Sequence, residues 1–484
     1  MRLFPVLAFF VNLFFLSFGL SAQSLEDSSA TIPGVKLQSS SESRNYVIIN
    51  RVLIEGNRKT QERIILRELD VQVGDTIYLP QADTILIRNK NKIFNTNLFV
   101  QVDVSLVRET YFEALLHIKL DERWYIFPAP IFELSDRNFN EWINTYNADL
   151  GRTNYGMRLV VENFRGRKEK LDALVQFGFT QKFGLLYEIP YIDRKQKHGL
   201  IFDLIYAQNK SIAYRTTDNK LSFIDSSSLV LERFEAGLSL TKRNAFYGVH
   251  RFEIKYFNNY VADTILRLNP SYFLNADNRQ EYLRFAYNFT YDKRDIAAYP
   301  LKGSLLIFNF QRNGLGFLKG LNSTHFSLGY GKYNDLGKKF YLENIFKVQA
   351  SFQPSQPYYN AKALGYGADV LRGYELYVVD GQGFFTNKNT LRYQLFKTQK
   401  TLGFVPLAQF RKIPLAAYIT AYFDTGYVRD RYFTEGNQRL SNKFLYGGGL
   451  GFDLVTFYDL VLKLNYSINR EGETGFYLNF KSAL

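Results

Sequence analysis

The chain has 484 residues, with no cysteine, only two tryptophans and four histidines. The absence of cysteine excludes disulfides and thiolate metal sites. It also fits an oxidising compartment, where a stray thiol would risk mispairing. Past the N-terminal segment, no apolar run reaches the roughly 20 residues that a membrane-spanning helix needs. The 35 tyrosines and 44 phenylalanines therefore indicate a large sheet rather than membrane helices.

The sequence also lacks the patterns that carry catalysis or nucleic-acid binding. The formal net charge is +14, but Lys and Arg are scattered, with no basic helix or stripe, so no nucleic-acid partner is expected. There is no G-x-S-x-G nucleophile elbow and no phosphate-binding or dinucleotide glycine pattern. We predict no enzymatic activity, no cofactor and no metal site, because the histidines are far apart: His117, His198, His250 and His325.

The N-terminus has the features of a targeting segment. Arg2 precedes a mostly apolar run from Leu3 to Leu20, and the small residues Ser21 and Ala22 follow. This pattern predicts a signal peptide over residues 1–22. The alternative is an uncleaved membrane anchor. Residues 23–45 are Ser-rich and polar, which is typical of a flexible leader. The mature protein is therefore expected to be exported.

Residues 46–122 predict one small α+β domain. A strand over 47–54 ends at the turn 55–57, and short helices follow over 61–69 and 80–94. Strands over 100–107 and 112–120 complete the order β-α-α-β-β. Many unrelated small α+β domains share this order.

From residue 123 to the end, the hydrophobic period changes to two, which indicates strands. In the clearest segment, Leu283, Phe285 and Tyr287 face one side, whereas Arg284 and Asn288 face the other. A soluble sandwich also alternates, but segments of about 9–12 residues with aromatic faces favour membrane-spanning strands. We predict a mainly β chain in which residues 123–484 form a sixteen-stranded antiparallel transmembrane β-barrel. The expected strands are 124–134, 153–164, 170–181, 184–192, 198–208, 229–241, 249–261, 280–292, 303–313, 323–333, 339–351, 384–397, 413–426, 441–453, 459–469 and 474–482.

The lengths of the connections alternate along the predicted barrel. If the N-terminal domain is periplasmic, connections after even-numbered strands are periplasmic and mostly short. Connections after odd-numbered strands lie outside the cell and include three long loops, 209–228, 262–279 and 352–383. This asymmetry is typical of bacterial outer-membrane barrels.

The longest of these loops contains an arginine with a candidate partner. Arg372 lies in Val370–Tyr374, and Asp424 shares a face with Tyr422 on the thirteenth strand, opposite its apolar face. A carboxylate in a narrow, partly dry lumen needs a partner, and a guanidinium offers a bidentate match. The alternative is that both are ordinary surface groups.

Two motifs in this region resemble those of a known family. The segment 371–374, LRGY, resembles the (V/I)RG(F/Y) motif in the sixth extracellular loop of the BamA/TamA family. The segment 422–426, YFDTG, resembles the (F/G)xDxG motif on strand thirteen, with Tyr422 replacing the usual first residue. The resemblance implies that the loop folds into the lumen and that Arg372 pairs with Asp424 there. The implied loop latch comprises Arg372, Gly373, Tyr374, Tyr422, Asp424 and Gly426.

The resemblance extends to both ends of the mature chain. Residues 54–57 and 97–99 make the N-terminal domain similar to a POTRA domain, the periplasmic module that precedes the barrel in this family. Residues 124–142 resemble the start of surface-antigen barrels that can follow a patatin-like lipase domain, although no such domain is found. The chain end resembles the signal by which outer-membrane barrels are recognised for assembly, although four residues follow its aromatic. The alternative is simply a last strand. The signal residues are Glu473, Gly475, Leu478 and Phe480.

The family implies an outer-membrane insertase or translocase. POTRA domains receive unfolded clients by strand addition, and a weakly closed seam, here between 124–134 and 474–482, templates client strands or opens a path into lipid. The implied partners are outer-membrane lipids and lipopolysaccharide, unfolded client proteins, and periplasmic proteins or lipoproteins. A single POTRA-like domain favours an accessory or client-dedicated role. Two alternatives stay open: a secretion pore dedicated to one partner protein, and a passive outer-membrane channel.

Overall fold

The computed structural model describes residues 45–134, 142–143, 147–226, 228–244, 247–315, 318, 320–401, 412–432, 436–456 and 460–481. The predicted signal peptide and almost all of the predicted leader lie outside these residues. Tyr46–Leu484 belongs to one compact unit. Among the described residues, no helix has the length and apolar character needed to cross a membrane.

The N-terminal domain is a four-stranded sheet with two helices, in the strand order β2-β1-β4-β3. Alternation places Val47 and Ile49 in the core and leaves Ile48 exposed; Ile64 and Ile93 of the two helices are also buried. The first helix is shorter than predicted, and strand β2 was missed because three residues cannot establish a period. The elements are β1 (Tyr46–Glu55), α2 (Glu62–Leu66), β2 (Thr76–Tyr78), α3 (Leu79–Phe94), β3 (Phe99–Arg108) and β4 (Glu113–Glu122).

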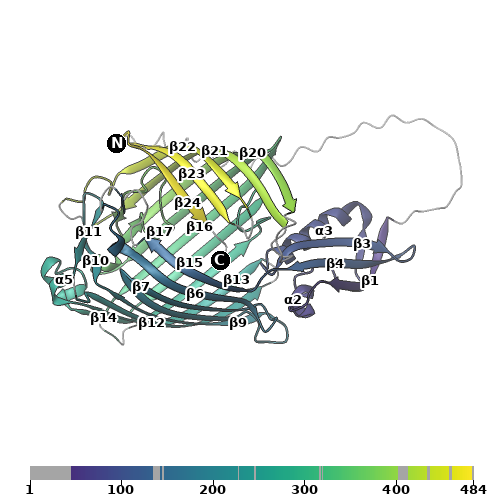
Figure 1. Cartoon of the computed structure of the whole chain (residues 1–484), viewed down its shortest axis with the longest axis horizontal. Helices are drawn as coiled ribbons and strands as arrows, with labels where there is room; N and C mark the ends of the chain where they lie inside the picture. Colours follow the sequence, from purple (N-terminus) through teal and green to yellow (C-terminus); the bar gives the residue numbers. More distant parts are fainter. Residues whose placement is uncertain are drawn as a thin grey trace. The chain divides into compact units, whose positions relative to one another are not determined.

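The rest of the chain forms a sixteen-stranded antiparallel sheet, drawn in Figure 1. All sixteen predicted strands are confirmed, with ends that move by a few residues. Strand β20 is longer than predicted and pairs with β21 over its whole length. The strands are β5 (Ile126–Leu134), β6 (Thr153–Phe164), β7 (Glu169–Gly178), β8 (Thr180–Ile189), β9 (His198–Asn209), β12 (Leu231–Asn244), β13 (Gly248–Val261), β14 (Arg279–Asp292), β15 (Gly303–Asn313), β16 (Ser323–Gly337), β17 (Phe340–Phe352), β20 (Gly383–Thr401), β21 (Lys412–Arg429), β22 (Phe444–Val455), β23 (Val461–Asn469) and β24 (Thr474–Lys481).

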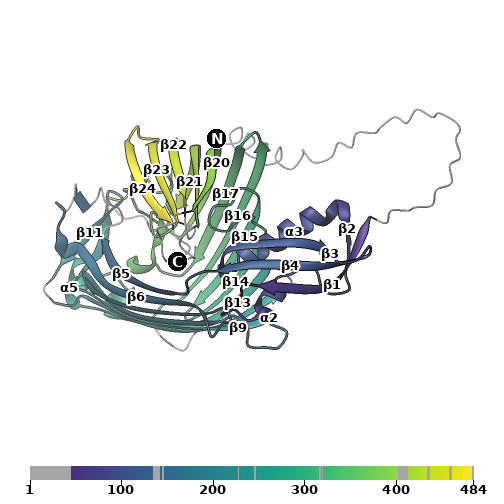
Figure 2. The same ribbon diagram turned by 45° about the vertical axis from the view of Figure 1, so that its right-hand side comes forward.

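The two ends of this sheet meet at a seam. The strand order starts at β24 and finishes at β5, and within the described residues no ladder joins these two strands. Figure 2 shows β24 and β5 as the two ends of the curved sheet. The outward side chains beside the seam are apolar and exposed, as for Phe132 (71%) and Leu478 (56%).

The connections define two rims. The domain-side rim holds the turns after β6, β8, β14 and β16, and hydrogen bonds tie it to the N-terminal domain, as from the Gln61 amide to the Gly166 carbonyl (3.0 Å). The far rim holds the long connections, which contain small elements where only loops were predicted. These elements are β10 (Ser211–Thr217), β11 (Lys220–Asp225), α5 (Asp263–Leu268), β18 (Lys362–Leu364) and β19 (Val379–Asp380).

Candidate functional site: a loop held inside the barrel

The connection between β17 and β20, residues 353–382, which we name the inward loop, brings Arg372 to Asp424. Arg372 Nε donates to Asp424 Oδ2 at 2.7 Å, and Arg372 Nη2 contacts the other carboxylate oxygen. Asp424 is fully buried on β21, with a side-chain exposure of 0%. The two-pronged geometry is the strong form of an arginine–carboxylate pair. The sequence-predicted partners therefore meet.

Two further groups stand around this pair. The Arg372 guanidinium carbon lies 4.0 Å from the centre of the Tyr422 ring, which adds a cation–π contact. The Tyr422 hydroxyl is 2.6 Å from the Ser467 hydroxyl on β23. Lys388 on β20 is directly opposite Asp424 in the ladder. Asp424 therefore has a cross-strand cation as well as Arg372, and Lys388 was not identified from the sequence.

Gly373 and Tyr374 dock the loop backbone against the last strands. Gly373 has a φ of +94°, and a Cβ there would lie 3.2 Å from the Asn469 Cβ. Asn469 Nδ2 donates to the Gly373 carbonyl (3.0 Å), and the Tyr374 hydroxyl donates to the Tyr446 carbonyl (3.2 Å). The site therefore uses glycine both for its left-handed backbone and for a close approach.

Two glycines of the barrel wall leave room for the inward loop to pack closely against the strands. A Cβ on Gly426 would lie 3.5 Å from Leu371, so the Leu371 side chain packs over this glycine. A Cβ on Gly447 would lie 2.3 Å from the Arg372 carbonyl oxygen, which excludes any other residue without movement of the loop. Gly447 was missed from the sequence, although glycines at 447–449 inside a strand are a sign of close backbone approach.

One residue of the predicted C-terminal signal lies at the edge of the site. Glu473 accepts hydrogen bonds from the Tyr377 hydroxyl of the inward loop (2.8 Å) and from Arg439 Nη2 (2.6 Å). Gly475 lies beside Tyr477 of its own strand, and Leu478 faces outward. Phe480 pairs with Leu462 along the backbone. The four signal residues therefore do not form one cluster, and Glu473 contacts the inward loop.

Asn219 joins three far-rim connections. It lies at the tip of the β10–β11 hairpin with a φ of +58°. Its backbone amide donates to Asn437 Oδ1 (2.9 Å), its Nδ2 donates to the Val378 carbonyl (3.1 Å), and its Oδ1 accepts from the Leu440 amide (3.1 Å). Val378 belongs to the inward loop. This loop is therefore held by a hydrogen bond at the far rim as well as by the ion pair of Arg372.

A domain-side turn, residues 293–302 between β14 and β15, enters the lumen from the other end. The buried Tyr299 hydroxyl donates to Asp453 Oδ2 on β22 (2.8 Å), and Arg392 Nη1 on β20 donates to the Pro300 carbonyl (2.7 Å). The Arg392 guanidinium carbon lies 4.4 Å from the centre of the Tyr299 ring. The turn therefore crosses the domain-side mouth from the eighth and ninth strands to the twelfth and fourteenth.

Tyr299→Phe should release this turn more often. The substitution removes a hydrogen bond to a buried carboxylate, worth about 1.5–3 kcal/mol, so the undocked population should rise roughly tenfold or more. Because the chain has no cysteine, the labelling rate of a single cysteine in place of Leu301, which packs with Tyr299, reports that population. Tyr393→Phe on the outer face is the control. Equal labelling in both variants would contradict a docked turn.

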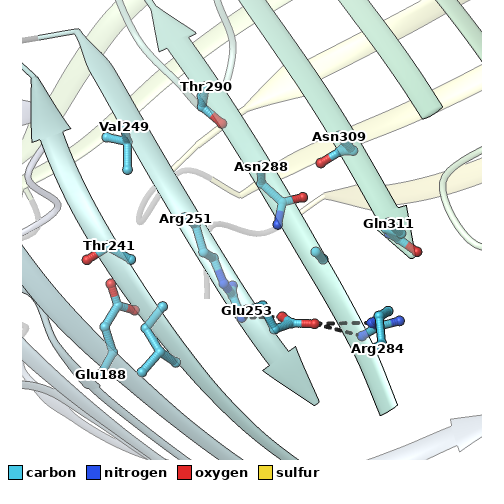
Figure 3. A pocket seen from close by; sticks show the side chains of 12 residues that line it. Glu188, Thr241, Val249, Arg251, Glu253, Arg284, Asn288, Thr290, Asn309 and Gln311 are labelled. Atoms are coloured by element: carbon cyan, nitrogen blue, oxygen red, sulfur yellow. Dashed lines mark hydrogen bonds and ion pairs between the residues drawn. The ribbon is translucent and has the colours of Figure 1, made fainter. Parts of the chain in front are cut away.

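The lumen wall away from these contacts holds a polar cavity of about 500 Å³. Figure 3 shows Glu253 pointing toward Arg284, with Arg251 beside it. Glu253 accepts from both arginines at 2.9 Å. The other labelled lining residues are mostly amides and hydroxyls, among them Asn288 and Gln311. In the part of the chain that is described, no group of His, Asp or Glu side chains is arranged to hold a metal ion.

The N-terminal domain contacts the domain-side rim through a buried carboxylate. Glu68, just after α2, accepts hydrogen bonds from both Nη atoms of Arg243 at the end of β12 (2.7 and 2.8 Å). Arg67 Nη1 donates to the same carboxylate at 3.2 Å. Burial would raise the pKa of Glu68, but the hydrogen bonds and charge of Arg243, with the charges of Lys168 and Arg67, outweigh it and lower the pKa to about 2.

Comparison with known proteins agrees with this geometry. Several solved structures align with 90% of the chain, among them the following two. BamA from Haemophilus ducreyi lacking POTRA domains 1–3 is 13% identical, with a TM-score of 0.50 and 83% of that chain covered. CdiB from Escherichia coli is 12% identical, with a TM-score of 0.52 and 75% covered. The chain is a BamA/TamA-like sixteen-stranded β-barrel. At these identities, the likeness concerns the fold.

Sequence comparison reaches a smaller part of this BamA/TamA-like barrel protein. The outer membrane protein assembly factor BamA of Nitratidesulfovibrio vulgaris strain Hildenborough is 37% identical over 81 residues. The match covers 16% of this chain and 10% of that protein, so the chain spans about a tenth of the relative's length. No family model matches.

Proposed function

We propose that this chain is an exported outer-membrane protein that assists the assembly, insertion or translocation of client proteins. The observation that carries the proposal is the seam, where the described parts of β5 and β24 share no ladder. A barrel with no role in handling clients gains stability when every strand is hydrogen-bonded to a neighbour on both sides. A seam that stays unpaired instead offers backbone groups to an incoming strand.

The N-terminal domain supports the same role as a POTRA-like periplasmic domain. Its sheet has two edge strands, β2 and β3, and edge strands can take up an extended client by strand addition. In this proposal, residues 1–22 are a signal peptide, 23–45 are a leader, 46–122 are the periplasmic domain, and 123–484 are the barrel. Glu473, Gly475, Leu478 and Phe480 serve as the chain's own assembly signal.

The latch has a structural role in this proposal. Arg372 and Asp424 hold the inward loop against the wall formed by β20 to β23, close to the seam. The turn at 293–302 occupies the opposite mouth. The inward loop and the turn at 293–302 thus occupy both ends of the lumen. This arrangement favours a protein that handles clients, because a passive channel would need neither the latch nor the docked turn. The proposed chemistry involves no catalysis, cofactor or metal. Besides clients, the proposed partners are outer-membrane lipids and lipopolysaccharide, with periplasmic proteins or lipoproteins as candidates.

Depletion of the protein should lower the abundance of client proteins in the outer membrane. The measurement is quantitative proteomics of outer-membrane and secreted fractions after depletion. The strain is complemented with the wild type, with Arg372→Ala, or with a chain that lacks residues 46–122. Broad loss of barrels, restored only by the intact protein, is the expected result.

The other outcomes of this experiment separate the alternatives. Loss of one secreted protein, with the outer-membrane barrels unchanged, would identify a dedicated secretion pore. If neither proteome changes, the client-handling proposal is wrong. Sizeable conductance of the reconstituted wild type, unchanged by deletion of residues 46–122, would then favour a passive channel.

A further inference from the structure

The four turns of the domain-side rim are strongly basic. Three Lys or Arg residues lie in each of the turns 165–168, 190–197 and 293–302, and two lie in the turn 338–339. The acidic residues of these turns are Asp193 and Asp295. Eleven cations therefore stand against two anions. Along the sequence these cations are scattered, but the antiparallel strand order brings all four turns to one rim.

The far rim has the opposite balance of charge. Its connections 262–278, 353–382 and 470–473 are described throughout, and together they carry four Lys or Arg residues against seven Asp or Glu residues. The difference between the two rims is therefore one of sign, with a net charge of +9 on the domain-side turns and −3 on these far-rim connections. The positive charge of the barrel is concentrated where the N-terminal domain joins it.

Two of the basic turns hold cations that no carboxylate neutralises. Elsewhere on the rim, Arg165 pairs with Glu169 at 2.7 Å and Lys302 pairs with Asp335 at 2.9 Å. The cations of the turns 190–197 and 338–339 are all exposed, and within the described residues none has a carboxylate within ion-pair distance. They are Arg194, Lys195, Lys197, Lys338 and Lys339.

Aromatic side chains on the outer face of the barrel lie directly beside the basic turns. Tyr291 shares the outer face of β14 with Phe289, and Lys293 Nζ lies 5.0 Å from the centre of the Tyr291 ring. Next to Lys339, the rings of Phe340 and Tyr393 pair on the outer face at 4.8 Å. Outer-membrane barrels have aromatic girdles at the level of the lipid headgroups. Cations just beyond such a girdle are at the level of the phosphates.

The same two turns also expose apolar side chains. Ile192 is 48% exposed in the turn 190–197, and Leu336 is 56% exposed at the end of β16, next to Lys338. An exposed apolar residue beside unpaired cations suits the boundary between acyl chains and headgroups, where both kinds of group find partners. It does not suit a surface that faces only water.

We propose that the basic turns of the domain-side rim bind the headgroups of anionic phospholipids in the leaflet beside the N-terminal domain. The inference rests on the proposed place of the barrel in the outer membrane and names the lipid class that one rim selects. The turns extend from the second to the eleventh strand of the sheet. Cations spread over so much of the circumference fit a surrounding leaflet better than one docked protein. The contact holds the barrel at a fixed depth in the membrane.

The test measures which lipid lies beside the turn 338–339. Because the chain has no cysteine, a bimane fluorophore is attached to Leu342→Cys, which lies on the outer face of β17 opposite Leu391. The full chain is reconstituted in vesicles of phosphatidylglycerol and phosphatidylcholine, with brominated acyl chains on one lipid or the other. Quenching should show a preference for phosphatidylglycerol of roughly tenfold or more, since each cation near an anionic surface contributes roughly fivefold.

Charge variants supply the decisive comparison. Lys338→Gln/Lys339→Gln should lower the preference roughly tenfold, whereas Lys338→Arg/Lys339→Arg should retain it. Arg267→Gln, on the exposed far-rim helix α5, is the matched control and should leave it unchanged. Salt at about 1 M should weaken the preference, because it shortens the screening length to about 3 Å. An excess of inorganic phosphate at constant ionic strength should have no effect. Heat-modifiable migration on gels confirms that each variant is folded.

Three results would overturn the inference: equal quenching by the two brominated lipids, an unchanged preference in Lys338→Gln/Lys339→Gln, or loss of the preference in inorganic phosphate, which would identify a site for the free ion. Failure of the proposed function is recognised separately. If depletion leaves the proteomes unchanged while the lipid preference persists, the client-handling proposal fails and the lipid contact stands. If depletion removes barrels but both lipids quench equally, the reverse holds.

Discussion

Arg372→Ala should lower the free energy of unfolding of the barrel by about 3 kcal/mol and free the inward loop from the lumen. Breaking a buried ion pair from one side costs about 3–5 kcal/mol, because the remaining charge stays buried without its partner. Asp424 is fully buried, which places the pair in that class. Lys388 stands opposite Asp424 on β20 and compensates part of the lost charge, so the lower end of the range is expected.

Two measurements check this result. Denaturant unfolding of the refolded barrel in detergent gives the change in free energy. Thiol labelling of a single cysteine in place of Ala363, which is buried in the inward loop, reports its release. Asp424→Asn should lower the free energy of unfolding at least as much as Arg372→Ala does, because it leaves both Arg372 and Lys388 without the carboxylate. Arg267→Ala, on the exposed helix α5, is the control and should change neither quantity.

A different result would revise the role of the latch. If Arg372→Ala destabilises the barrel but leaves Ala363→Cys unlabelled, the far-rim contacts of Asn219 and Glu473 hold the loop without Arg372. If neither stability nor labelling changes, the pair contributes nothing to either, and its role as a latch is wrong.

Local sequence patterns sufficed for the strands and for the central pair. Successive side chains of a barrel strand point alternately to the lumen and to the outer surface, so a sequence period of two marks a strand that is long enough. Arg372 and Asp424 could be matched because each lies in a short motif. The β10–β11 hairpin escaped prediction because its residues pack on other loops rather than on a continuous wall, so its tip at Asn219 carries no periodic signal.

The missed contacts join segments that are far apart in the chain. Tyr299 reaches Asp453 across the lumen, and Glu68 reaches Arg243 between the N-terminal domain and the barrel. Neither pair belongs to a motif, and a single sequence offers many equivalent tyrosines and carboxylates. Gly447 is the exception, because a run of glycines inside a strand pattern indicates close backbone approach.

The contact between the N-terminal domain and the barrel should weaken in acid. Glu68 is 2% exposed, and its pKa is lowered from 4.5 to about 2 in the folded state, where Arg243 and its neighbours outweigh the effect of burial. A carboxyl group with a lowered folded-state pKa stabilises the fold fully above its unfolded pKa. That stabilisation is lost as the pH falls through the folded value. A pKa difference of about 2.5 corresponds to about 3 kcal/mol.

The expected pH dependence therefore lies between about pH 4.5 and pH 2 and is absent above it. Glu68→Gln should remove about 3 kcal/mol at neutral pH, because it leaves Arg243 and Arg67 beside a neutral amide, and it should flatten this pH window. Glu62→Gln, an exposed neighbour on α2, is the matched control. Denaturant unfolding, followed by a fluorophore on a single cysteine in place of the exposed Leu66, measures both effects.

If the wild type and Glu68→Gln lose stability in parallel below pH 4.5, groups other than Glu68 control the acid response. A neutral-pH loss confined to Glu68→Gln, with the pH window flattened, would locate the acid-sensitive contact at Glu68 and Arg243.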